Sequence, residues 1–196
     1  QFSIPLKVEG YFQAMNILCA VGLAIASGEP SERVFENMQH LKPISGRLEY
    51  CGKNIKGAKI YVDYAHTPAA LTAAIFSLRE LTENNIILVF GCGGERDKLK
   101  RSVMGGIASE YADFVIVTDD NPRNEDPEEI RSQIINNCND ALEISDRAEA
   151  IKKGIETGKK GDSIIIAGKG HEKYQVIGQD TIPFSDQETV RNILGK

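Results

Sequence analysis

The sequence predicts an α/β protein with a Rossmann-like, doubly wound and mostly parallel sheet, helices on both of its faces, and a helical segment in front. Two observations favour this fold. Strand-like and helix-like segments alternate along most of the chain, as they do in successive βαβ units. The strands also include short apolar runs rich in β-branched residues, such as Phe114–Val117 and Ser163–Ala167, which is typical of strands covered on both faces.

The first part of the chain predicts helices only. Residues 11–28 place apolar and small residues at helical spacing, and residues 31–41 form a second amphipathic stretch that Ser31 can cap. Two helices without a sheet of their own suggest the C-terminal end of a preceding domain, with residues 42–46 as the linker. We therefore predict two parts, residues 1–44 and residues 45–196. The chain starts at Gln1 rather than Met, so we expect it to belong to a longer protein.

After the linker, strands and helices alternate. Residues 48–51 and Lys59–Asp63 predict a hairpin, because the glycine-bounded residues 52–57 separate them. The further predicted elements are a helix over 68–81, a strand Ile86–Phe90, a helix over about 98–111, a strand Phe114–Val117, a helix over about 127–138, a helix capped by Ser145 or Asp146 that ends near 156, a strand Ser163–Ala167, a short antiparallel pair over 174–177 and 181–183, and a closing helix from Asp186.

Composition excludes several classes of function. The formal net charge of −5 gives no basic surface for nucleic acid. No apolar run approaches the roughly 20 residues of a membrane-spanning helix, and we expect no secretion signal. The four cysteines have neither C-x-x-C nor zinc-finger spacing, so we expect reduced thiols, no metal site and a cytoplasmic location.

Polar loops follow four of the strands, and right-handed crossovers bring such loops to one edge of a parallel sheet. In the first loop, Asp63 is suited either to ribose hydroxyls or to capping a helix, and His66 either to phosphate or base or to a structural hydrogen bond. In the second, clustered glycines precede Arg96, which either clamps a carboxylate or phosphate or is a solvated surface residue. No P-loop motif occurs, so the main phosphate site of any ATP lies outside this sequence.

The third and fourth loops carry charges of both signs. Asp120 and Arg123 lie in a loop with carboxylates, an amide and one guanidinium, the groups that hold a ligand bearing both an ammonium and a carboxylate. Pro122 restricts the direction in which Arg123 points. In the fourth loop Glu172 suits an ammonium, although a tight turn with exposed Lys169 and Glu172 explains the same pattern.

Taken together, the motifs DYAHTP, GCGGERDKLKR, TDDNPR and AGKGHE resemble the C-terminal part of the Mur ligases that add the third residue to the peptidoglycan precursor. The resemblance covers essentially the whole chain. It implies a three-domain enzyme of cell-wall synthesis, in which ATP and Mg²⁺ convert UDP-N-acetylmuramoyl-L-Ala-D-Glu to an acyl phosphate that an incoming amino acid attacks. Residues 1–44 would then end the central ATP-binding domain, and residues 45–196 would form the amino-acid-binding domain, monomeric and inactive alone.

The resemblance also implies roles for individual residues. Those matching contacts to meso-diaminopimelate are Arg96, Asp120, Asn121, Pro122, Arg123, Gly168 and Glu172. Those matching positions around ATP are Asn16, Arg47, Asp63, Tyr64 and His66. The P-loop, the metal ligands and the catalytic groups would belong to the missing central domain.

Three other interpretations remain open from the sequence. A ligase of the same family could add lysine instead of diaminopimelate. A stand-alone Rossmann-type module would bind a nucleotide by itself, although the G-x-G-x-x-G motif is absent. An acidic Mg²⁺ site of receiver or phosphatase type would use Asp119 and Asp120, with Asp63 as the further acid.

Overall fold

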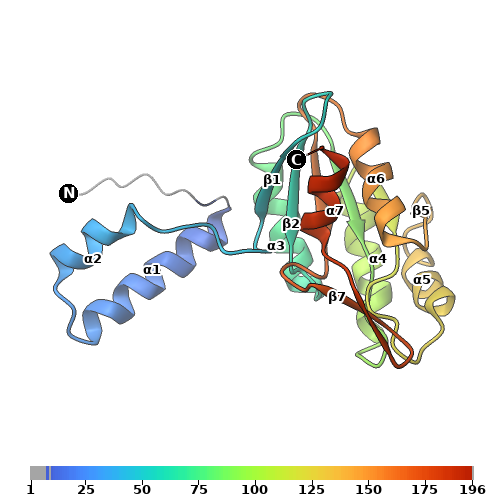
Figure 1. The fold of residues 1–196 in the computed structure, drawn as a ribbon, viewed down its shortest axis with the longest axis horizontal. Coiled ribbons are helices and arrows are strands. Elements are labelled where there is room, and N and C mark those ends of the chain that lie inside the picture. The colour runs from blue at the N-terminus through green and yellow to red at the C-terminus, as the bar shows by residue number, and fades with distance from the viewer. Residues whose placement is uncertain (1–7, 9, 196) are drawn as a thin grey trace. The chain divides into compact units, whose positions relative to one another are not determined.

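The computed structural model describes residue 8 and residues 10–195, and these divide into two compact units, Gln1–Ile44 and Ser45–Lys196. The first unit contains two helices, α1 (Tyr11–Ala26) and α2 (Ser31–Met38), which pack against each other (Figure 1). Helix α2 ends before the predicted residue 41.

The second unit is built on a six-stranded sheet with the order β1-β2-β6-β3-β4-β5. Its strands are β1 (Glu49–Lys53), β2 (Lys59–Asp63), β3 (Ile86–Phe90), β4 (Phe114–Val117), β5 (Leu142–Glu143) and β6 (Ser163–Ala167). Only β1 runs antiparallel to its neighbour, so the predicted mostly parallel sheet is confirmed. The antiparallel pair β7 (Tyr174–Ile177) and β8 (Asp180–Pro183) forms a separate hairpin.

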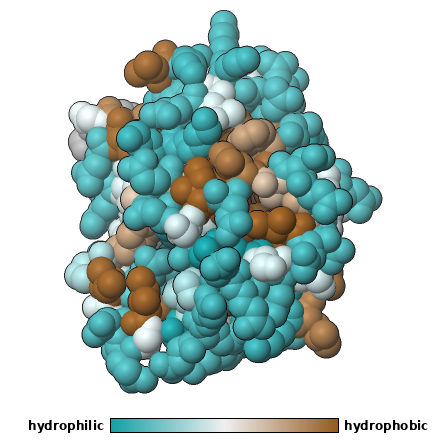
Figure 2. Space-filling model, turned by 90° about the vertical axis from the view of Figure 1, so that its right-hand side faces the viewer, coloured by the Kyte–Doolittle hydropathy of each residue, from teal (hydrophilic) through white to brown (hydrophobic). Residues whose placement is uncertain are grey.

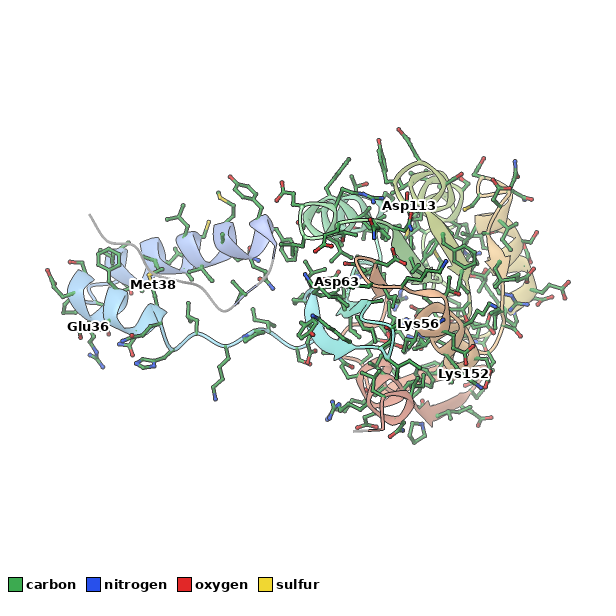
Figure 3. All side chains as sticks on the ribbon, turned by 90° about the horizontal axis from the view of Figure 1, so that it is seen from above. Glu36, Met38, Lys56, Asp63, Asp113 and Lys152 are labelled. Atoms are coloured by element: carbon green, nitrogen blue, oxygen red, sulfur yellow. The ribbon has the colours of Figure 1, made fainter. Side chains whose placement is uncertain are left out.

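Helices cover both faces of this sheet, as expected for a doubly wound fold. The crossovers α3 (Pro68–Arg79), α4 (Leu99–Tyr111) and α5 (Pro127–Ile135) run in one direction across the sheet and therefore lie on one face. Helix α6 (Arg147–Thr157) returns on the other face, where α7 (Asp186–Ile193) packs beside it. Figure 3 looks along the layers and shows the green helices and the orange and red helices on opposite sides of the strands.

The sheet forms the core because its central strands are apolar on both faces. Every residue of β3 and β6 is buried. On the α6 side, Val89 and Ile164 pack against Ile151 and Ile155, and each buried aliphatic side chain contributes about 1.5–3 kcal/mol. Gly154 allows α6 to approach closely, since a Cβ there would lie 2.8 Å from Cγ2 of Val89.

The strand register places the ends of four strands at one level. Ala167 at the end of β6 is the register partner of both Asp63 at the end of β2 and Phe90 at the end of β3. Phe90 in turn pairs with Val117 at the end of β4. The four polar loops therefore start side by side at the carboxyl edge of the sheet, where open α/β sheets bind ligands.

Local sequence signals set the helix starts. Thr67, Asp126, Asp146 and Ser185 each accept a hydrogen bond from a backbone N–H of the helix that follows. The sequence does not predict β5, which has two residues, and it extends α5 past its observed end at Ile135. Residues 136–141 turn the chain towards β5, which pairs with β4.

Among the described residues, the helices are too short or too polar for any of them to cross a membrane. The side of the molecule in Figure 2 is largely hydrophilic, and its hydrophobic patches are separate from one another.

Candidate functional site

A cavity of about 690 Å³ lies at the carboxyl edge of the sheet, and all four polar loops contribute to its wall. Most of the residues singled out from the sequence line it: Tyr64, His66, Arg96, Asp120, Asn121, Arg123, Gly168 and Glu172. Pro122 is buried behind this wall. The loops are far apart in sequence, and the level strand ends bring them together.

Arg123 is held in an unusual backbone conformation at the cavity wall. Its φ of 53° lies in the left-handed region that non-glycine residues rarely adopt. Two backbone hydrogen bonds to the β7–β8 hairpin stabilise it: its N–H donates to Val176 O (3.0 Å), and Gly178 N–H donates to its carbonyl (2.7 Å). The side chain crosses to the glycine loop, where Nη1 donates to Gly94 O at 2.7 Å. The same Nη1 donates to Asn121 O in its own loop at 3.3 Å.

Arg96 lies on the same wall, with Gly93 close to both guanidinium-bearing side chains. A Cβ at Gly93 would be 2.9 Å from Nη1 of Arg123 and 3.9 Å from Cγ of Arg96. Arg96 is exposed, and its Nη1 donates to Glu95 O at 3.1 Å. Two guanidinium groups from different loops therefore line one hollow, an arrangement suited to a carboxylate.

A buried arginine that the site prediction omitted joins the glycine loop to the loop after β4. Arg101 is completely buried and donates to Gly93 O (3.2 Å), Glu125 Oε2 (3.0 Å) and Gln133 Oε1 (2.8 Å). The hydrogen bond from Arg101, with further ones from the Glu95 backbone and Lys98, lowers the pKa of Glu125 to about 2. Arg101 is the third residue of α4 and ends the charged segment GGERDKLKR, a pattern typical of exposed residues, so no sequence signal indicates its burial.

Asp120 supplies a buried carboxylate to the same cavity, opposite in charge to the two arginines. It is 7% exposed, and a Cβ at Gly168 would lie 2.6 Å from its Oδ2, so only glycine fits there. Burial raises the pKa of Asp120. The positive charges of Arg147 and Lys169 oppose this shift, and the negative charges of Glu172 and Asp186 add to it.

Asn121, Lys169 and Glu172 form a hydrogen-bonded triangle beside Asp120. Lys169 Nζ donates to Asn121 Oδ1 (2.8 Å) and to Glu172 Oε2 (3.2 Å), and Asn121 Nδ2 donates to the same Glu172 oxygen (2.9 Å). Lys169 is fully buried, so the exposed turn considered from the sequence is wrong for this residue. Its partner Asn121 is 48 residues away along the chain, which is why the sequence pattern does not reveal the contact.

The β7–β8 hairpin fixes the same loop from the other side. Gln175 Nε2 donates to Asp120 O (2.6 Å), and Val176 N–H donates to Asn121 Oδ1 (3.0 Å). Beneath the loop, Arg147 and Asp186 form a fully buried ion pair with two 2.8 Å hydrogen bonds. Arg147 also donates to Ala167 O at the end of β6 (3.1 Å) and to Asp119 O in the loop after β4 (3.4 Å), so it supports both the strand end and the loop.

Of the residues predicted to surround the nucleotide, only some line this cavity. Tyr64 and His66 line the cavity, and the guanidinium of Arg47 lies 4.7 Å from the centre of the Tyr64 ring. Asp63, labelled in Figure 3, ends β2 and accepts backbone hydrogen bonds from Leu48 (2.6 Å) and Ala65 (2.7 Å). Its contacts thus order the chain before and after β2, and a ribose contact stays a prediction.

Asn16 lies on α1, in the first unit, where it lines an apolar groove between α1 and α2. Its side chain donates to Gln13 Oε1 at 3.4 Å. Its predicted contact with ATP also stays a prediction.

The acidic residues considered for a metal site do not converge. Asp119 accepts a hydrogen bond from Arg131, which also donates to Glu143 Oε1 at 2.7 Å. Within residue 8 and residues 10–195, no group of three or more His, Cys, Asp or Glu side chains is arranged to hold a metal ion. These contacts give the acidic Mg²⁺ interpretation no support.

Comparison with known proteins assigns the chain to a family. Residues 46–170 match the family described as Mur ligase, glutamate ligase domain. The chain is 50% identical over 194 residues to UDP-N-acetylmuramoyl-L-alanyl-D-glutamate--2,6-diaminopimelate ligase of Rhizobium meliloti (strain 1021), and 48% identical over 195 residues to the protein of that name from Agrobacterium fabrum (strain C58 / ATCC 33970). These alignments cover 99% and 100% of this chain but 40% of each relative.

Solved structures agree with the sequence match. One, a UDP-N-acetylmuramoyl-L-alanyl-D-glutamate--2,6-diaminopimelate ligase, superposes with a TM-score of 0.75 at 36% identity over 99% of this chain and 40% of its own. A UDP-N-acetylmuramate-alanine ligase from Thermotoga maritima shares the fold with a TM-score of 0.69 at 17% identity, covering 100% of this chain and 40% of its own. The chain belongs to the Mur ligase family and contains its glutamate ligase domain.

Proposed function

We propose that this chain is the C-terminal, amino-acid-binding part of an ATP-dependent ligase that adds meso-diaminopimelate to UDP-N-acetylmuramoyl-L-Ala-D-Glu during peptidoglycan synthesis. The observation that carries the proposal is the shared cavity of Arg96, Arg123 and Glu172. The relatives that span the chain at about half identity bear the name of such a ligase, and the chain covers 40% of their length.

The charge pattern of the cavity fits an amino acid with a charged group of each sign at its far end. In the proposed complex, Arg96 and Arg123 receive the far carboxylate, and Glu172 and Asp120 receive the far ammonium. The near amino group is then left to attack the activated carboxyl of the other substrate. Binding at several points holds this nucleophile in place, which is the contribution this domain would make to the rate.

Lysine is the natural competitor because it has the same length and a terminal ammonium but lacks the far carboxylate. With lysine bound, Arg96 and Arg123 would face an empty position, and the charge-assisted hydrogen bonds to that carboxylate would be lost. A site built around such polar pairs discriminates strongly against a ligand that lacks one member. The arginine pair therefore favours diaminopimelate over lysine as the substrate.

The rest of the ligase would supply the ATP and Mg²⁺ sites. In this chain, Tyr64, His66 and Arg47 provide an aromatic and cationic surface that fits a nucleotide at the cavity rim. When bound, ATP supplies the phosphoryl group that activates the substrate carboxyl. The monomeric state and cytoplasmic location expected from the sequence belong to the same proposal.

The first unit is proposed to be the end of the preceding ATP-binding domain. Helix α1 exposes large apolar side chains, with Tyr11, Leu18 and Leu23 at 70%, 62% and 71% exposure, and Gln13 is its only buried described residue. An apolar groove of about 460 Å³ separates parts of α1 and α2. Such surfaces are normally covered, and the matching relatives contain more than half of their length outside this chain.

Steady-state kinetics of the full-length ligase would test the proposal. With ATP and the nucleotide-linked dipeptide saturating, kcat/KM for meso-diaminopimelate should exceed that for L-lysine by about 10⁴-fold or more. The 196-residue chain alone should release no phosphate from ATP. A higher kcat/KM for lysine would show that the enzyme is a lysine-adding ligase of the same family. Tight binding of a nucleotide to the chain alone, without any ligase activity of the full-length protein, would favour a stand-alone nucleotide-binding module.

A further inference from the structure

Lys169 is a buried cation behind the cavity wall, and the proposed substrate contacts do not use it. It lies two residues after the end of β6 and is 0% exposed, although lysine is rarely fully buried unless it is paired. Its Nζ lies within hydrogen-bond distance of Asn121 Oδ1 (2.8 Å) and Glu172 Oε2 (3.2 Å), and 5.9 Å from the centre of the Tyr174 ring. Each of these three partners also lines the cavity.

The first consequence of this contact is a fixed orientation for the Asn121 amide. Its Oδ1 accepts from Lys169 Nζ and from the backbone N–H of Val176 (3.0 Å). Rotating the amide by half a turn would place its NH₂ group against two donors, which cannot pair with it. Nδ2 is thereby directed at Glu172, and the two hydrogen bonds from Asn121 and Lys169 both end on Glu172 Oε2. One oxygen of the carboxylate is thus held by the protein.

The second consequence concerns the charge of this region. Four charged groups that act on Asp120 are the cations Arg147 and Lys169 and the carboxylates Glu172 and Asp186. Together with Asp120 they carry a net charge of minus one, which a single ammonium group neutralises. Without Lys169 the net charge would be minus two, and closely spaced carboxylates in such a site tend to take up a proton instead of remaining ionised.

We propose that Lys169 is a positioning and specificity-determining residue, which holds Glu172 and Asn121 in the orientation that receives one ammonium group and limits the uncompensated charge of the site to one carboxylate. This inference rests on the proposed function, because the ammonium is that of the incoming diamino acid. Lys169 acts through Glu172 and does not touch the substrate.

Two effects of removing Lys169 oppose each other. Loss of a positive charge would strengthen attraction for an ammonium, but it would also remove a hydrogen bond that fixes the direction of the Glu172 carboxylate. Orientation dominates, because hydrogen bonds to charged groups are the strongest ones in such a site. In the full-length ligase, Lys169→Met, which keeps an unbranched side chain one atom shorter and removes the charge, should therefore raise the KM for meso-diaminopimelate by about 10- to 100-fold.

The experiment measures kcat and KM for both the diamino acid and ATP. Lys173→Met is the matched control, because Lys173 is exposed four residues further along the same loop. It should change neither KM by more than about twofold, and Lys169→Met should leave the KM for ATP within about the same range. A KM for meso-diaminopimelate that stays within twofold of wild type, or that falls, in Lys169→Met overturns the inference.

A double substitution tests whether Lys169 acts through Glu172. Glu172→Gln alone should raise the KM for the diamino acid, and adding Lys169→Met should raise it by no more than about threefold further, because the group to be positioned is already lost. Independent multiplication of the two effects would assign Lys169 a role that bypasses Glu172 and contradict the inference. The double variant also removes both charges of the pair, so it tests the inference even where Lys169→Met alone unfolds.

The wild-type enzyme in the same assay separates this inference from the proposed function. If wild type does not turn over meso-diaminopimelate, the proposed function fails and the inference fails with it. If wild type uses the diamino acid and the Lys169 variants behave like the Lys173 control, only the inference fails.

Discussion

The guanidinium of Arg123 donates a 2.7 Å hydrogen bond to the carbonyl of Gly94, which joins the loop after β4 to the glycine loop after β3. The backbones of the two loops touch at the same place, since a Cβ on Gly94 would collide with the carbonyl oxygen of Pro122. The direction of Arg123 thus depends on a glycine 29 residues earlier in the chain.

We expect Gly94→Ala to destabilise the protein and widen this loop contact. Backbone atoms cannot move aside as a flexible side chain can, so the free energy of unfolding should fall by about 1–3 kcal/mol, as for overpacked sites. Gly106→Ala in α4 is the control, because nothing lies within 4 Å of the added Cβ. That substitution should raise the stability by about 0.5–1 kcal/mol. Urea denaturation of both variants compares the two, and equal effects would contradict the described loop contact.

Arg123→Ala should raise the KM of the full-length ligase for meso-diaminopimelate by about 10- to 100-fold, the equivalent of about 1.5–3 kcal/mol for a charge-assisted hydrogen bond. The KM for ATP should change little, since Arg123 is proposed to pair only with the amino acid. Arg191→Ala, on the exposed side of α7, is the matched control and should match wild type. An unchanged KM for the amino acid would remove Arg123 from its binding site.

Removing one member of the buried ion pair Arg147–Asp186 should destabilise the protein much more than replacing both members. Both side chains are 0% exposed, so Arg147→Met leaves a buried carboxylate without its partner and should cost about 3–5 kcal/mol of unfolding free energy. Combining it with Asp186→Leu should recover most of that loss. Denaturant unfolding of both variants makes the measurement, and a double variant less stable than Arg147→Met would show that the pair is not the cause.

The pH dependence of stability should include a contribution from Glu125. Its pKa in the folded protein is about 2, against an ordinary value of 4.5, because it accepts hydrogen bonds from Arg101, from the Glu95 backbone and from Lys98. A lowered folded-state pKa stabilises the fold above the ordinary pKa, and that stabilisation is lost as the pH falls towards 2. The stability difference between wild type and Glu125→Gln should therefore shrink between pH 5 and pH 2, and a constant difference would contradict this assignment.

The contribution of Asp120 to the pH dependence of stability should have the opposite sign. Burial raises its pKa in the folded protein, so its charged form costs stability at neutral pH, and this cost disappears as acid protonates the group in both states. Asp120→Asn should accordingly raise the thermal unfolding midpoint at pH 7, with a smaller gain at acidic pH, while weakening the affinity for the diamino acid. A lowered midpoint at pH 7 would mean that Arg147 and Lys169 stabilise the charged form more than burial penalises it.

Much of the fold can be predicted from the sequence because the residues that determine its strands and helix starts lie within those elements or next to them. The apolar runs of β3, β4 and β6, the capping residues Thr67 and Asp126, and the polar segments after the strands all lie within a few residues of the structure that they determine. Parallel pairing then brings the loops together, so the sequence predicts a shared site for Arg96, Arg123 and Glu172, and all three line one cavity.

The supporting contacts of the site could not be predicted in this way. Lys169 pairs with a residue 48 positions away, and Arg101 pairs with Glu125 and Gln133 on separate elements. An isolated lysine or arginine in a polar segment has the pattern of an exposed residue, and only the tertiary arrangement shows that these two are buried. The residues that would hold the ligand were visible in the motifs, and those that hold the site together were not.

The most direct test of the central claim is a structure of the full-length ligase with meso-diaminopimelate bound. We predict that the far carboxylate lies within hydrogen-bond distance of the guanidinium groups of both Arg96 and Arg123, and that the far ammonium lies within that distance of Glu172. A diamino acid bound outside this cavity, or with its far carboxylate away from both arginines, would contradict the account.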